Sequence, residues 1–308
     1  MQELNQKTIL KPISFEGSGL HSGKPCNVKL LPALDNVGIV FKRVDLKENN
    51  LIKACYKNVS SAKLCTTLKN SNGAEVSTVE HLMAAFYITG IDNVTVEINN
   101  SELPIMDGSS KDFVNLIEKS GLKTLNSKRK FLKILKTVEL KDGEKSISIE
   151  KSDSGLNVNF ELGYDNKIIG NQKNEVKFNE QDLNDVYTSR TFCLFEDIEK
   201  IKKNGLAKGG SLENAIVVKD KEIMNKGGLR NKKEFVNHKI LDLVGDFLLS
   251  GYRILGSVKC LQGGHQLSNT FLKKLLEDRS NFIEITSNSI NLIKKDFKTS
   301  INKLAVNA

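Results

Sequence analysis

Apolar and polar residues alternate in short runs through roughly the first 120 residues, and this pattern predicts β-strands because successive strand side chains face opposite sides. The segment STVEHLMAAFYITG (77–90) instead has helical spacing, with Ser77 or Thr78 suited to the N-cap and Gly90 to the end of the helix. A second helix is expected at 110–120. The predicted strands include CNVKLL (26–31), GIVFKRV (38–44) and NVTVEI (93–98).

The same kinds of pattern return in the second half, after the polar and basic segment 122–130, which is typical of a linker. A long helix is expected at 234–251 and a further helix from about Ser268. Strands are expected at 131–140, 145–150, 156–162 and 253–261.

An internal repeat appears when the two long apolar helices are compared. VEHLMAAFYITG is followed by IDNVTVEI, and VNHKILDLVGDFLLSG is followed by YRILGSVKCL, so each unit has Val-x-His, an apolar helix, a glycine and a strand. We interpret the repeat as a duplicated α+β fold, in which His81 and His238 face each other; chance similarity of two amphipathic helices is the alternative. The expected organisation is an N-terminal α+β domain (1–125), a C-terminal α+β domain (126–280) with an insertion at 195–218, and a tail (281–308).

The composition allows a core in each unit, because hydrophobic residues make up 39% of the 308 positions. No apolar run approaches the roughly 18 residues of a membrane-spanning helix, and the polar N-terminus lacks a secretory signal, so we expect a cytoplasmic protein. The five cysteines are odd in number and form no CxxC pair, which favours reduced thiols. Any bound metal must then rely mainly on histidine and carboxylate ligands.

The net charge of +9 leaves nucleic acid, peripheral contact with an anionic membrane surface and a phosphate-bearing substrate open. Lysines spread along the whole chain also fit a simple solubilising role. Aromatic residues make up 6% and tryptophan is absent, which argues against base-stacking platforms. We therefore expect no nucleic-acid partner.

His238 and Asp242 are four residues apart in the long helix, so their side chains share one face. An imidazole and a carboxylate at this spacing suit zinc, which in catalytic sites commonly takes three protein ligands and a water. Taken alone, an HxxxD pair is more often a surface charge pair. Leu241, Val244 and Phe247 indicate, however, that this helix is partly buried, and a buried carboxylate needs a partner.

His81 is the natural third ligand, and Glu80 beside it is suited to act as general base. The alternatives are a hydrogen-bonded core histidine and an acid that complements the helix macrodipole. Asp246 continues the face that carries Asp242, and His265 follows a double glycine on a turn before the last helix. There His265 is suited to be a general acid held protonated by Asp246, or else a capping histidine.

Other residues have weaker claims to chemistry. His21, in the turn GSGLHSGKP, suits a structural or substrate-edge role, and Cys65 is either a small core residue or the fourth ligand of a closed structural zinc site. In the insertion, Ile198 and its apolar neighbours either line a groove or pack on their own domain, and spacing alone favours packing. The chain has no GxSxG, no Walker loop and no GxGxxG in a βαβ setting, so metal-activated water is the best-supported chemistry.

Five segments together resemble the UDP-3-O-acyl-N-acetylglucosamine deacetylase family, the zinc enzymes that commit lipid A synthesis. The resemblance runs in order along the chain as far as the lysine-rich segment that starts at Asn281. The segments are VEHLMAAFYITGIDNVTVEINNSELPIMDGSS (79–110), SRTFCL (189–194), GLAKGGSLENAIVV (205–218), EFVNHKILDLVGD (234–246) and GGHQLSN (263–269).

The resemblance implies two α+β domains, each a sheet packed on helices, with the helices sandwiched between the two sheets. It implies one catalytic Zn²⁺ held by His81, His238 and Asp242, a ligand set that Fe²⁺ also fits. The implied substrate is a UDP-linked acylated amino sugar, whose diphosphate suits the positive charge of the chain. The implied reaction hydrolyses the N-acetyl group of UDP-3-O-acyl-N-acetylglucosamine and releases acetate.

The resemblance also implies roles for individual residues. Glu80 would be the general base, and His265, with Asp246 as its partner, would stabilise the oxyanion and protonate the leaving amine. Thr191 would help to stabilise the oxyanion, and the insertion would form the passage for the acyl chain, which reverses the packing interpretation. The implied substrate contacts are Lys239 at the anionic part, Phe192 at the nucleotide end, and Ile198, Gly210 and Ser211 in the insertion.

Overall fold

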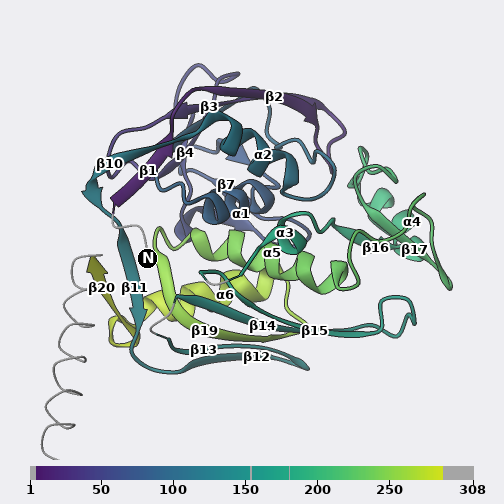
Figure 1. Cartoon of the computed structure of the whole chain (residues 1–308). Coiled ribbons are helices and arrows are strands. Elements are labelled where there is room, and N and C mark those ends of the chain that lie inside the picture. The colour runs from purple at the N-terminus through teal and green to yellow at the C-terminus, as the bar shows by residue number, and fades with distance from the viewer. Residues whose placement is uncertain (1–4, 153–154, 180, 287–308) are drawn as a thin grey trace, which may run out of the picture.

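Two β-sheets enclose a layer of helices in the computed structural model, which describes residues 5–152, 155–179 and 181–286 (Figure 1). The first sheet has five strands in the order β2-β3-β9-β4-β5. Alternate side chains of β3, those of Cys26, Val28 and Leu30, are buried, as the sequence pattern predicts. The strands are β2 (Ile13–Ser18), β3 (Pro25–Pro32), β4 (Ile39–Arg43), β5 (Leu51–Lys53) and β9 (Val94–Ile98).

The second sheet has seven strands around the central strand β19 (Arg253–Leu261). Its first three residues pair with β11, and its remaining six pair with β14 and with β13. The other strands are β11 (Lys130–Ile134), β12 (Val138–Asp142), β13 (Lys145–Lys151), β14 (Leu156–Gly163), β15 (Asn171–Lys177) and β20 (Phe282–Thr286).

The two sheets repeat one topology. Along β2-β3-β9-β4-β5 the pairings are antiparallel, antiparallel, parallel and antiparallel. The strands β12-β13-β19-β14-β15 follow the same sequence of directions. A helix precedes and another follows the central strand in each half, which confirms the duplicated α+β fold that the sequence predicts.

The helices lie between the sheets, where α1 and α5 form the centre of the molecule (Figure 1). In α1 the residues from Glu80 to Tyr87 are all buried, and in α5 every residue except Lys239 is buried. Polar residues on such helices need partners within the protein. Within the described residues, no helix combines the length and the apolarity that crossing a membrane would require. The helices are α1 (Glu80–Thr89), α2 (Lys111–Ser120), α3 (Asn184–Tyr187), α5 (Glu234–Leu248) and α6 (His265–Glu277).

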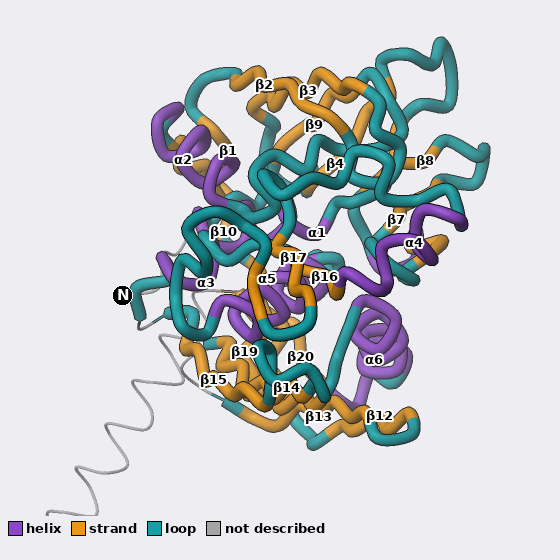
Figure 2. The backbone as a smooth tube through the Cα atoms, turned by 90° about the vertical axis from the view of Figure 1, so that its right-hand side faces the viewer, coloured by secondary structure: helices purple, strands orange, loops and turns teal. Residues whose placement is uncertain are grey.

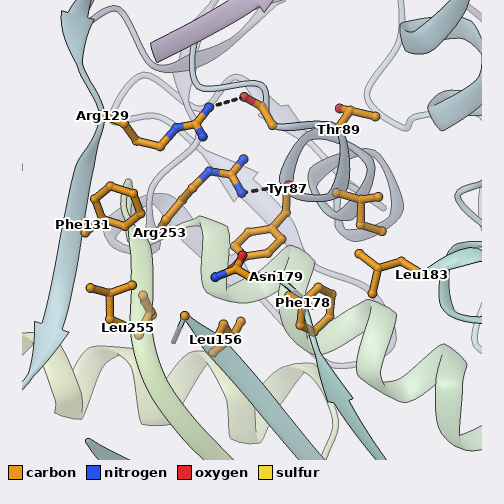
Figure 3. Close-up of a pocket in the computed structure, with 14 residues that line it drawn as sticks. Tyr87, Thr89, Arg129, Phe131, Leu156, Phe178, Asn179, Leu183, Arg253 and Leu255 are labelled. Atoms are coloured by element: carbon orange, nitrogen blue, oxygen red, sulfur yellow. Dashed lines mark hydrogen bonds between the residues drawn. The ribbon is translucent and has the colours of Figure 1, made fainter. Parts of the chain in front are cut away.

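Two arginines join the halves at the C-terminal end of α1 (Figure 3). Arg253, the first residue of β19, donates from Nη1 to the carbonyl of Tyr87 at 2.9 Å, and Arg129 donates from Nη2 to that of Gly90 at 2.7 Å. Asp92 lies between the guanidinium groups, and the surrounding residues line a cavity of about 250 Å³. Cations are favourable at a helix C-terminus, so this contact ties the second sheet to the first half.

The insertion forms a three-stranded sheet and a helix at one side of the molecule, in front of α5 in Figure 2. No residue of its helix α4 is buried. The predicted insertion, 195–218, contains α4 (Phe195–Lys203) and most of β17 (Ile216–Lys219), and the sheet is completed on either side by β16 (Phe192–Leu194) and β18 (Glu222–Ile223). The remaining elements are β1 (Asn5–Ile9), β6 (Val59–Ser61), β7 (Thr67–Lys69), β8 (Glu75–Val76), β10 (Leu122–Lys128) and the 3-10 turns η1 (Tyr56–Asn58) and η2 (Arg279–Asn281).

Several element boundaries differ from those expected. Neither Ser77 nor Thr78 caps α1: Val79 occupies the N-cap, while Thr78 adopts a left-handed φ of 58° and donates its hydroxyl to Glu102 Oε1 at 3.1 Å. The single strand expected at 131–140 is two strands, β11 and β12. The last helix begins at His265, so this histidine opens α6 and does not lie on a turn before it.

The ends of the proposed domains also carry structure that the sequence did not reveal. The prediction of a linker at 122–130 is wrong, because most of this segment forms β10, which pairs with β1. Residues 282–286, assigned from the sequence to the tail, form β20 beside β11. The rest of the expected tail, 287–308, lies outside the described residues.

Candidate metal centre and active site

His81, His238 and Asp242 converge where α1 meets α5. His81 is the second residue of α1, while His238 and Asp242 are one turn apart on α5. Asp242 Oδ1 lies 3.5 Å from Nε2 of His81 and 3.3 Å from Nε2 of His238, and all three side chains are buried. Within residues 5–152, 155–179 and 181–286, this is the group of histidine, cysteine and carboxylate side chains arranged to hold a metal ion.

The chemistry of these three groups fits a metal. Asp242 Oδ1 and His81 Nδ1 are buried and have no hydrogen-bond partner among the described residues. His238 Nδ1 lies 3.1 Å from the carbonyl oxygen of Ser189, so a proton on Nδ1 leaves the Nε2 lone pair directed at the cluster. Burial lowers the pKa of His238 to about 3, and the imidazole is therefore neutral, as a metal ligand must be.

The pKa of Asp242 lies well below its ordinary value. Burial alone would raise it, but the neighbouring imidazole of His238 and the positive charges of Lys239 and His265 outweigh burial. Two imidazole nitrogens and one carboxylate oxygen thus face one another, and in the neutral ring of His238 the Nε2 lone pair is directed at the carboxylate. This donor set is typical of catalytic sites for zinc and for iron.

Glu80 and His265 lie beside the three ligands, and each is the first residue of a helix. Glu80 Oε1 lies 3.7 Å from His265 Nε2, while Nδ1 of the same ring lies 2.9 Å from Asp246 Oδ2. Thr66 completes the group: its backbone N–H donates to Glu80 Oε2 at 3.0 Å, and its hydroxyl donates to Asp246 Oδ1 at 2.6 Å. The imidazole of His265 therefore lies between two carboxylates, with Glu80 at Nε2 and Asp246 at Nδ1.

The pKa values of Glu80 and His265 are both raised, by burial in the first case and by neighbouring carboxylates in the second. Burial raises the pKa of Glu80, against the effects of His265 and His81. Burial alone would lower the pKa of His265, but the carboxylates of Asp246, Glu80 and Asp242 outweigh it and raise the pKa to about 10. His265 is consequently protonated at neutral pH, and the cluster offers a proton acceptor and a proton donor on one side of the ligands.

Two further expected site residues, Lys239 and Phe192, lie beside the ligands. Lys239 lies 3.0 Å from Asp242 Oδ2, and its ammonium sits over the ring of Phe192, 5.5 Å from the centroid. The Phe192 ring in turn lies 6.4 Å from that of His238. Thr191 precedes β16 and is held by its backbone N–H, which donates to the carbonyl of Gly108 at 2.8 Å.

The insertion residues lie farther out. Ile198 on α4 is half-buried, while Gly210 and Ser211 are exposed on the loop that follows the helix. This loop docks on the turn that contains His21, because Lys208 N–H donates to the carbonyl of His21 at 3.2 Å. The structure therefore joins the insertion to the His21 turn, a contact that the sequence pattern does not indicate.

Two residues with no counterpart in the sequence-based site emerge from the structure. Thr66 links Glu80 to Asp246, and the buried carboxylate of Glu102 accepts the backbone N–H groups of His21 and Ser22, both at 2.7 Å. Cys65 does not belong to the metal-holding group, which disfavours the closed structural site that would use it as a fourth ligand.

Comparison with known proteins identifies the family of the chain. The family model described as UDP-3-O-acyl N-acetylglycosamine deacetylase matches residues 6–277. A UDP-3-O-acyl-N-acetylglucosamine deacetylase of Geotalea uraniireducens is 43% identical over 272 residues, covering 88% of each chain. Proteins of the same name from Wigglesworthia glossinidia brevipalpis and Citrifermentans bemidjiense are 40% and 41% identical, covering 90% and 93% of this chain and 94% of each relative. The chain thus belongs to the UDP-3-O-acyl-N-acetylglucosamine deacetylase family.

Proposed function

We propose that the protein hydrolyses the N-acetyl group of UDP-3-O-acyl-N-acetylglucosamine, giving UDP-3-O-acyl-glucosamine and acetate, the committed step of lipid A biosynthesis. The observation that carries the proposal is the buried cluster in which two imidazoles and a carboxylate face one another beside Glu80 and a protonated His265. Membership of the deacetylase family supports the choice of substrate.

His81, His238 and Asp242 would hold a Zn²⁺ ion, for which nitrogen and carboxylate oxygen donors are suitable; Fe²⁺ is the alternative for the same set. Bound zinc supplies Lewis-acid chemistry, polarising a carbonyl and lowering the pKa of water toward neutrality. Ser189 assists from outside the ligand set, because its carbonyl fixes the ring of His238.

Glu80 acts as the general base in this proposal. Its carboxylate accepts a proton from the water that attacks the acetamide carbonyl, and burial raises its pKa, which improves it as a proton acceptor. The backbone N–H of Thr66 holds Oε2, so Oε1 is the oxygen free to take the proton. This oxygen faces His265 across 3.7 Å.

His265 acts as the general acid in this proposal. Its Nδ1 proton is held by Asp246, and its charged Nε2–H is available to stabilise the negative charge that develops on the carbonyl oxygen. The same group then gives its proton to the departing amine. Thr191 would add a second donor to the oxyanion.

The remaining residues assigned to the site would contact the rest of the substrate. Lys239 and Phe192 would bind the anionic and nucleotide parts, and Ile198, Gly210 and Ser211 would line the passage of the acyl chain. The exposure of every α4 residue to some degree supports this assignment, because none of them is used to build the core. The charge of +9 favours a substrate that carries a diphosphate.

Metal content and acetate release, measured together, test the proposal. Wild-type protein should contain about one zinc, as a three-ligand site implies, and should release acetate from UDP-3-O-acyl-N-acetylglucosamine. Asp242→Asn should lose metal and turnover together. Asp246→Asn, the same change one turn later on α5, is the matched control: it should keep the metal and lose most of the turnover. Wild-type protein that binds zinc but releases no acetate would overturn the proposed reaction.

A further inference from the structure

We propose that Thr66 is a positioning residue that fixes the general base and the partner of the general acid at once. It lies immediately before β7, is 1% exposed, and comes from the first half of the chain. The inference rests on the proposed function, since it concerns the geometry of that reaction. Thr66 lies behind the two carboxylates and does not take part in proton transfer itself.

Each carboxylate divides its two oxygens between Thr66 and His265. Glu80 accepts the Thr66 N–H at Oε2 and presents Oε1 to His265 Nε2. Asp246 accepts the Thr66 hydroxyl at Oδ1 and presents Oδ2 to His265 Nδ1. The four residues therefore form a closed ring, in which Thr66 occupies both far oxygens and the imidazole faces both near oxygens.

The ring spans the two halves of the molecule. Glu80 opens α1 in the first half, whereas Asp246 and His265 lie on α5 and α6 in the second. The backbone of Thr66 is itself attached to the start of α1, because its carbonyl accepts the N–H of Val79 at 3.4 Å. Thr66 thus fixes Glu80 relative to Asp246, the residue that orients His265.

Loss of the hydroxyl would leave Asp246 Oδ1 buried without this donor. An unsatisfied buried carboxylate oxygen is costly, so the carboxylate would turn to find another partner and Oδ2 would leave its place on the imidazole. The backbone bond to Glu80 would persist, because it does not depend on the side chain. The expected defect is therefore in the orientation of His265, while the metal ligands and the substrate-binding surface stay intact.

Three variants separate this role from a merely structural one. Thr66→Val removes the hydroxyl with little change of shape, and Thr66→Ser restores it. Thr8→Val is the matched control, because Thr8 is also 1% exposed and its hydroxyl accepts the N–H of Ala33, in a different part of the first half. Thr66→Val should lower kcat roughly ten- to a hundred-fold, the range for losing a hydrogen bond to a charged group, with KM and zinc content unchanged. Thr66→Ser should recover most of kcat, and Thr8→Val should leave it unchanged.

A double variant tests whether Thr66 acts through Asp246. If it does, adding Thr66→Val to Asp246→Ala should reduce kcat no further. The NMR signal of the His265 Nδ1 proton gives a readout that needs no turnover: it should move in Thr66→Val and stay in place in Thr8→Val.

The outcomes distinguish this inference from the proposed function. An unmoved proton signal, an unchanged kcat in Thr66→Val, or additive losses in the double variant would each overturn the positioning role. Failure of wild-type protein to release acetate would overturn the reaction, and the proton signal would still decide whether Thr66 orients His265.

Discussion

Gly245 of α5 lies directly against the carbonyl group of Glu80 in α1. A Cβ at Gly245 would lie 2.2 Å from the Glu80 oxygen and 3.1 Å from the backbone nitrogen of Ala84. Only a residue without a side chain allows the two central helices to approach this closely. The spacing between the ligands on α5 and the ligand on α1 depends on this contact.

Gly245→Ala should separate the helices and reduce both stability and turnover. Overpacking of a dense interior costs about 1–3 kcal/mol of unfolding free energy, and here it would also displace Glu80. Chemical denaturation and acetate release measure the two effects. A variant with wild-type stability would mean that α1 and α5 can shift without strain.

Glu80→Gln should abolish proton acceptance while keeping the shape of the side chain. Turnover should fall roughly 10²–10⁴-fold, with zinc content preserved, because Glu80 is not among the ligands. Glu75→Gln makes the same chemical change at a half-exposed residue of β8 and should leave turnover intact. Near-normal rates in Glu80→Gln would remove this residue from the mechanism.

The pH dependence of kcat/KM should report His265. Its pKa is raised to about 10, so the acid form persists through neutral pH, and loss of this proton should lower activity as pH rises toward that value. The stabilisation of the folded state by this charge follows the same sign: it is complete below the ordinary pKa of 6.5 and is lost as pH rises through about 10.

Asp246→Asn should move this alkaline limb to lower pH, because it removes the carboxylate that raises the pKa of His265 most. Asp165→Asn, at an exposed position, serves as the control and should leave the limb in place. If kcat/KM of Asp246→Asn falls at the same high pH as in the wild type, the titration belongs to a group other than His265.

Arg253→Met should weaken the contact between the halves at the far end of α1. The change removes the bond to the Tyr87 carbonyl and the ion pair with Asp92, which should cost about 1–3 kcal/mol of unfolding free energy. Arg279→Met is the matched control, since that side chain is 82% exposed and its loss should change stability by no more than about 0.5 kcal/mol. If both variants change the free energy of unfolding equally, Arg253 does not hold the two halves together.

Ile198→Asp should discriminate between long and short acyl substrates. The residue is half-buried on a helix with no buried residues, so stability should change little. KM should rise for a long-chain substrate and hardly change for a short-chain analogue, because only the long chain would reach α4. Glu199→Gln, at the neighbouring exposed position, should affect neither substrate.

Local patterns predict those parts of the site that lie within one helix. His238 and Asp242 could be paired because a helix places residues four apart on one face, and the repeat of Val-x-His identified His81 as their counterpart. The duplicated sheets could be foreseen for the same reason, since each apolar helix leads through a glycine to a strand.

Contacts between segments that are distant in the sequence could not be predicted from local patterns. Thr66 and Asp246 are separated by 180 positions, and nothing in the sequence around Thr66 distinguishes a threonine that binds a carboxylate from one that fills a core. The left-handed conformation of Thr78 could not be predicted either, because it opposes the preference of a β-branched residue and accompanies a tertiary hydrogen bond to Glu102.

The convergence of α1 and α6 has an electrostatic consequence. Glu80 and His265 open these two helices, so the N-terminal ends of both macrodipoles meet at the cluster, and each contributes roughly half a positive charge from unpaired backbone N–H groups. The peptide backbone therefore favours anions at this point, including the charge that forms on the acetamide oxygen. Since the source is the main chain, no exchange of a single side chain can remove it.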